Sequence, residues 1–97
     1  MDYIEEVNKG EKLIEERQQE YNSKKNLYNI YSNRKRYLGT LLNDMKKIVR
    51  QLEIDIERYN KLHLQVTEIG LQLRFSMIIA KLKEIKQKYE LILERHK

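Results

Sequence analysis

Apolar residues recur every three or four positions over most of this sequence, and that spacing limits the folds open to it. From Leu38 to Leu73 the steps place one apolar face along about ten turns of α-helix. The same spacing resumes at Ile78 and runs to Ile92, with lysine, glutamine and glutamate on the opposite face. The sequence has no proline and only three glycines, so few residues interrupt helices. We therefore predict an all-α protein of long amphipathic helices.

The first third of the sequence has a thinner apolar stripe. Its members are Ile4, Val7, Ile14, Tyr21, Tyr28 and Tyr31. Three polar residues, Glu11, Gln18 and Lys25, occupy the alternate core positions. A helix with such a stripe needs a stronger partner to pack against, and residues 38–94 provide one.

The expected elements are a helix at about residues 2–35, a connection at about 33–40 and a second helix at about 41–95. Gly39 can adopt a positive φ, and Thr40 can cap a helix that starts at the next residue. Gly70 is a second candidate break, since glycine often follows the last turn of a helix. The apolar spacing nevertheless continues across Gly70 in phase, so the sequence leaves open whether the helix ends there.

One stretch also has the alternating pattern of β-strands. Its apolar positions are Leu62, Leu64, Val66, Leu71, Leu73, Phe75, Met77 and Ile79. Helices plus a β-hairpin over residues 62–79 are therefore an alternative, although an isolated hairpin is only marginally stable. The helical interpretation accounts for the same residues and continues into both flanks, so we prefer it.

Residues 64–82, drawn as a helix, are apolar on nearly every side, and such a helix must be buried on most sides. A chain of 97 residues offers few helices to surround it. We therefore predict a helical hairpin that self-associates into a coiled-coil or four-helix-type bundle. A monomeric three-helix bundle, with helices at about 2–35, 40–69 and 71–96, is the alternative. The predicted self-association core is Leu52, Ile56, Leu62, Val66, Ile69, Leu73, Ile78, Leu82, Ile85, Tyr89 and Ile92.

The net charge of +5 is unevenly distributed along the chain, with −4 in residues 1–20 and +7 in residues 21–50. Lysine and arginine can neutralise phosphates, and tyrosine can stack on unpaired bases. Four tyrosines, at positions 21, 28, 31 and 37, are interleaved with the basic residues. No base-reading motif is present, so such binding would be sequence-blind. The candidate phosphate-binding residues are Lys24, Lys25, Arg34, Lys35, Arg36, Lys46, Lys47 and Arg50.

Residues suited to catalysis or metal binding are few. The sequence has no cysteine, and its only histidines are His63 and His96. His63 could act as an acid–base group with Asp55 or Glu57, but a surface histidine on a helix is the commoner case. Glu53 and Glu57 have the spacing of a ligand pair, which is commonplace on helices. We expect no enzymatic activity, no metal and no cofactor.

The function that these observations predict is a non-enzymatic assembly or interaction module that contacts further copies of itself and another protein through helix surfaces. The alternative is a small basic subunit that lies along a nucleic-acid backbone inside a larger complex. Residues 71–88 combine apolar and basic side chains, but Glu84 and Glu90 dilute the charge, so a core-facing helix is preferred over a membrane-surface helix. No apolar run reaches transmembrane length and the start of the chain is acidic, so a cytoplasmic location is the default expectation.

Overall fold

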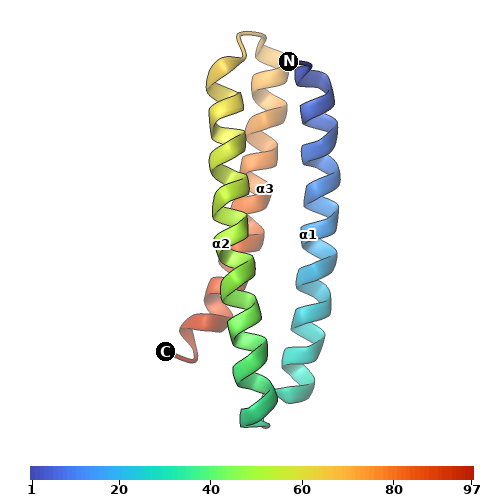
Figure 1. Ribbon diagram of the computed structural model, residues 1–97. Helices are drawn as coiled ribbons and strands as arrows, with labels where there is room; N and C mark the ends of the chain where they lie inside the picture. The colour runs from blue at the N-terminus through green and yellow to red at the C-terminus, as the bar shows by residue number, and fades with distance from the viewer.

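Three long helices make up almost the whole chain. The computed structural model describes all 97 residues, with α1 at Tyr3–Tyr31, α2 at Lys35–Gln65 and α3 at Ile69–Glu94. In Figure 1, α1 and α3 run in the same direction and α2 runs in the opposite one. The bundle measures 50 × 21 × 17 Å. The all-α prediction is confirmed. The β-hairpin alternative is wrong, because residues 62–79 contain the end of α2, a short turn and the start of α3.

The predicted second helix, residues 41–95, folds as the two antiparallel helices α2 and α3. The chain turns at Val66–Glu68, ahead of Gly70, which lies in the first turn of α3 without a positive φ. The Val66 carbonyl accepts a hydrogen bond of 2.9 Å from the side-chain amide of Gln72. The turn needs no glycine, because none of its residues has a positive φ.

The first connection is shorter than predicted and spans Ser32–Arg34. Helix α2 begins at Lys35 and runs through Gly39 and Thr40, which were expected to mark its boundary. Gly39 has no positive φ, and the space where a Cβ would lie is open. Helix α2 can extend this far because Leu38 and Leu41 pack on the core on either side of the glycine.

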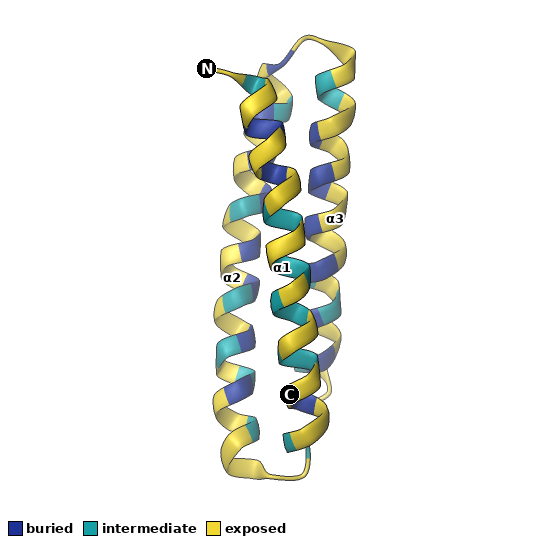
Figure 2. Ribbon diagram, turned by 90° about the vertical axis from the view of Figure 1, so that its right-hand side faces the viewer, coloured by how far each residue is buried: buried dark blue, intermediate teal, exposed yellow.

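The hydrophobic core lies mainly between α2 and α3, and its buried positions line the inward faces of the helices (Figure 2). Helix α1 contributes four buried residues, which are Glu6, Val7, Gly10 and Tyr28. At Gly10 a Cβ would lie 2.7 Å from Ile78 Cδ1 and 3.0 Å from Tyr59 Cε1. Glycine therefore permits the close approach of α1 to the other two helices.

Polar contacts hold α1 where its apolar stripe is thin. The Arg17 guanidinium lies 3.2 Å from the Asp55 carboxylate, and the Arg58 guanidinium donates to the partly buried Glu6 carboxylate at 2.7 Å. The Tyr21 ring meets the Tyr89 ring edge to face, with centroids 5.0 Å apart. Helices α2 and α3 are thus the stronger partner that the N-terminal segment was predicted to need.

Candidate functional site

The predicted self-association residues lie mostly inside a single chain. Nine of the eleven are buried in the three-helix core, so their side chains pack against the other helices of the same molecule. Ile69 and Leu73 are the exceptions, with 72 % and 61 % of their surface exposed. The structure is a three-helix bundle, the arrangement that the sequence analysis treated as the alternative.

A short apolar stripe runs along the outside of α3. Ile69, Leu73 and Met77 are spaced four residues apart, which places them on neighbouring turns of the helix, and all three are exposed. Ala80, one turn further on, is exposed as well. We call these four residues the outer α3 face. Helices α1 and α2 thus cover the inward side of α3, whereas the outer α3 face is exposed to solvent.

Charge is divided between the two ends of the bundle. The ion pairs Arg17–Asp55 and Lys86–Glu53 mark a common level across the three helices. On the side of the α1–α2 connection, residues 18–54 and 86–97 hold twelve lysines and arginines against five aspartates and glutamates. We call this the basic half, with a net charge of +7. The other half, residues 1–17 and 55–85, holds eight basic and ten acidic residues, for a net charge of −2, and we call it the acidic half.

The two halves also differ in how their cations are used. In the acidic half, six of the eight basic residues form an ion pair, whereas in the basic half only Lys24 and Lys86 do. Lys24 Nζ lies 3.8 Å from the Asp44 carboxylate. The other seven predicted phosphate-binding residues have no acidic partner within 4 Å. The basic half therefore presents its positive charge largely unneutralised.

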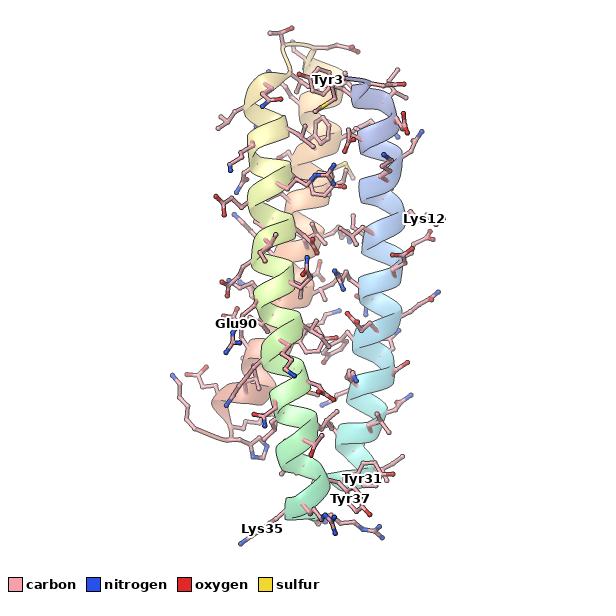
Figure 3. All side chains as sticks on the ribbon, in the orientation of Figure 1. Tyr3, Lys12, Tyr31, Lys35, Tyr37 and Glu90 are labelled. Carbon is pink, nitrogen blue, oxygen red and sulfur yellow. The ribbon has the colours of Figure 1, made fainter.

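Most of the predicted phosphate-binding residues are exposed at the start of α2 or along it. Arg34, Lys35 and Arg36 are exposed at the α1–α2 connection, and Lys47 and Arg50 are exposed further along α2. The figure labels Lys35 at the tip of the bundle (Figure 3). Residues 36, 47 and 50 are separated by eleven and three positions, so they share one face of α2.

Two further cations join this half from the other end of the chain. Lys97 shares a groove of about 310 Å³ with Lys46, and Arg95 follows the last turn of α3. His96 Nε2 lies 2.8 Å from the Tyr28 hydroxyl, which fixes the C-terminus against α1. Sequence reasoning missed Arg95 and Lys97, because only the return of α3 along the bundle brings them to this end. The net charge of +4 over residues 71–97 was the one available signal.

Helix dipoles favour some of these cations and disfavour others. Basic side chains are favoured at helix C-termini, and Arg34 and Arg95 lie at or just past the C-caps of α1 and α3, although the last turns themselves contain no lysine or arginine. Lys35 and Arg36 instead lie in the first turn of α2, where the dipole disfavours positive charge. Arg34, the N-cap residue, makes no capping hydrogen bond with its side chain. The start of α2 thus lacks both a side-chain cap and an acidic residue in its first turn.

The interleaved tyrosines separate into two pairs. Tyr28 is buried, and Tyr21 packs edge to face on Tyr89, so both belong to the core. Tyr31 and Tyr37 lie side by side at the α1–α2 connection (Figure 3), with ring centroids 5.1 Å apart and an interplanar angle of 33°. Tyr37 remains 54 % exposed. Tyr21 and Tyr28 also contact cations, with Lys88 Nζ 5.6 Å from the Tyr21 ring centroid and Lys25 Nζ 5.2 Å from the Tyr28 ring centroid. Tyr37 differs from them in that most of its surface is exposed.

No acid–base or metal constellation comes together elsewhere. His63 makes no hydrogen bond or ion pair with Asp55 or Glu57, and Asp55 is engaged by Arg17 and Gln51. No three histidine or acidic side chains are grouped so that they could hold a metal ion. Glu53, half of the predicted ligand pair, faces Lys86 across the α2–α3 groove.

Comparisons of the chain with protein-family models, with curated proteins and with solved structures find no match. None of the three helices is both long and apolar enough to cross a membrane. The two surfaces of the molecule that could contact a partner are the basic half and the outer α3 face.

Proposed function

We propose that this protein is a non-enzymatic helical interaction module whose main contact surface is the basic half, and that its partner there is the phosphate backbone of a nucleic acid. The single observation that carries this proposal is the cluster of unpaired cations. Lysines and arginines without acidic partners extend from the α1–α2 connection along α2, where they can neutralise several phosphates at once.

A backbone is the best-fitting anionic partner because the cations are spread over a surface and are not gathered in one pocket. Arg34, Lys35 and Arg36 cover the tip, and Lys47 and Arg50 continue along the flank of α2. A line of phosphates can follow such a distribution, whereas a single small anion would engage only part of it. Recognition of this kind positions the protein but does not read sequence.

The test is a charge reversal with a matched control. Replacing Arg34, Lys35 and Arg36 by Glu should weaken binding to a fluorescently labelled DNA oligonucleotide by at least about tenfold at 50 mM salt, since three phosphate contacts become repulsive. Fluorescence anisotropy measures the affinity. The control replaces Lys12, Lys61 and Lys83 by Glu, which changes the net charge equally but in the acidic half.

The control variant should stay much closer to wild type than the tip variant does. Wild-type affinity should also fall steeply between about 50 and 200 mM salt, because each neutralised phosphate releases condensed counterions. Equal losses in the two triple variants would mean that net charge alone attracts the DNA, and would reject the basic half as the contact surface.

Self-association through the outer α3 face is a second candidate, favoured by the exposure of three large apolar residues in one stripe. We infer that the occupant is a second copy in antiparallel orientation. Such a pair, centred between Leu73 and Met77, places Glu68 of each copy at the level of Lys81 and Lys83 of the other. Lys81 is already paired with Glu84 of its own helix at 3.9 Å, so Lys83 is the cation left to attract Glu68 of the other copy.

A further inference from the structure

A groove between the end of α1 and the start of α2 combines aromatic and cationic side chains. Its volume is about 380 Å³, within the range of small-ligand sites. The residues that line it are Lys24, Leu27, Tyr31, Arg36, Tyr37, Thr40, Leu41 and Asp44. The groove opens directly beside Arg34 and Lys35, the unpaired cations of the α1–α2 connection.

Tyr37 is the one aromatic side chain in the molecule with most of its surface exposed. Tyr31 contacts it from the α1 side and holds the ring at the edge of the groove. Neither hydroxyl makes a hydrogen bond within the protein, so hydrogen bonding does not explain why the two rings are placed there. An exposed ring braced by a second ring offers a flat surface on which another π-system can stack.

The charges around the groove suit a nucleotide. Arg36 lines the groove itself and has no acidic partner. Asp44, the only acid in the lining, lies 3.8 Å from Lys24, which offsets its repulsion of a phosphate. In proteins that bind single strands, bases stack on aromatic side chains while a positive groove follows the backbone.

We infer that this groove takes a base of a single-stranded nucleic acid, stacked on Tyr37, while the adjoining phosphates contact Arg34, Lys35 and Arg36. The inference rests on the proposed function and makes it specific, because a duplex keeps its bases paired and cannot offer one to the ring. A single-stranded nucleic acid is therefore the expected ligand.

The experiment compares strands that differ only in their bases. Three labelled DNA probes of equal length are used at about 50 mM salt: an oligo(dA) strand, an abasic strand with the same number of phosphates, and a duplex. Wild-type protein should bind oligo(dA) about tenfold more tightly than the abasic strand, as expected for one stacked base. Tyr37→Ala should remove most of this preference, and Tyr37→Phe should keep it because the ring is retained.

Ile30→Ala serves as the control, since Ile30 is an exposed apolar residue near the same end of the bundle. It should leave the preference for bases unchanged. Equal wild-type affinity for oligo(dA) and the abasic strand would overturn the stacking inference and leave phosphate binding intact. Tighter binding of the duplex would overturn it too. Failure to bind any of the three probes would overturn the proposed function as well.

Discussion

At the scale of single residues, Tyr89 has the least favourable environment in the core. Its hydroxyl is buried and has no hydrogen-bond partner. Burial raises the pKa of Tyr89, and the nearby Glu20 carboxylate adds to that effect. A buried polar group without a partner costs about 1–3 kcal/mol, so this side chain is retained at an expense to stability.

Tyr89→Phe should therefore raise the free energy of unfolding at pH 7, by up to about 1 kcal/mol. Tyr28→Phe, the control, should lower it by about 1 kcal/mol, because the Tyr28 hydroxyl lies 2.8 Å from His96 Nε2. Urea unfolding followed by circular dichroism measures both. A loss of stability in Tyr89→Phe would mean that the hydroxyl has a partner, such as an ordered water.

The same variant should respond differently to alkaline pH. The raised pKa means that the folded state keeps Tyr89 protonated while the unfolded chain ionises near pH 10. Ionisation of Tyr89 stabilises the unfolded chain only above its own pKa. The free energy of unfolding is therefore unaffected by this group below pH 10 and falls as pH rises from there towards the higher pKa of the folded state. Tyr89→Phe should accordingly lose less stability above pH 10 than wild type does.

At the scale of elements, two glycines in two helices have opposite requirements. Gly39 in α2 faces open space, whereas Gly10 in α1 lies against Ile78 and Tyr59, which are both buried. Gly39→Ala should stabilise the protein by about 0.5–1 kcal/mol through helix propensity. Gly10→Ala gains the same propensity but overpacks the core, so it should be at least about 1 kcal/mol less stable than Gly39→Ala. Equal gains in urea unfolding would show that α1 can shift away without cost.

Helices could be predicted from this sequence better than the turns that join them. The spacing of Leu52, Ile56 and Leu82 marks inward positions regardless of which helix covers them. The turn at Val66–Glu68 has no glycine, proline or asparagine, and it depends on the Gln72 side chain that bonds to Val66. Such a contact forms only once α3 has begun, so local composition pointed to Gly70 instead.

At the scale of the whole molecule, the burial of the apolar residues in 64–82 depends on α3 running back along α2. They were predicted to be buried by a partner chain, yet Phe75, Ile78 and Leu82 are buried by helices of the same chain. The basic half was foreseeable from charge along residues 21–50. The contribution of Arg95 and Lys97 and the pairing of Tyr31 with Tyr37 were not, because each joins segments that only the tertiary fold brings together.

Because the outer α3 face is separate from the core, self-association and folding should respond to different substitutions. Leu73→Lys, on the outer α3 face, should leave the helix content intact and convert a dimer near 24 kDa into a monomer near 12 kDa. Ile78→Lys should unfold the chain, because that side chain is 1 % exposed and an unpaired buried charge costs several kcal/mol. Ile54→Lys, at an exposed position on α2, is the control and should remain dimeric. Light scattering that finds a wild-type monomer at about 100 µM would reject this candidate.

The outer α3 face and the basic half occupy opposite parts of a 50 Å rod, and this separation has a consequence for architecture. Two copies joined antiparallel along α3 would carry their cationic tips at opposite poles. Each tip could then bind a different strand, since neither tip lies near the α3–α3 contact between the two copies. On the proposal that the basic half binds a nucleic acid, such a pair would cross-link two strands at a set spacing, and shortening the rod by whole helical turns should bring those strands closer together.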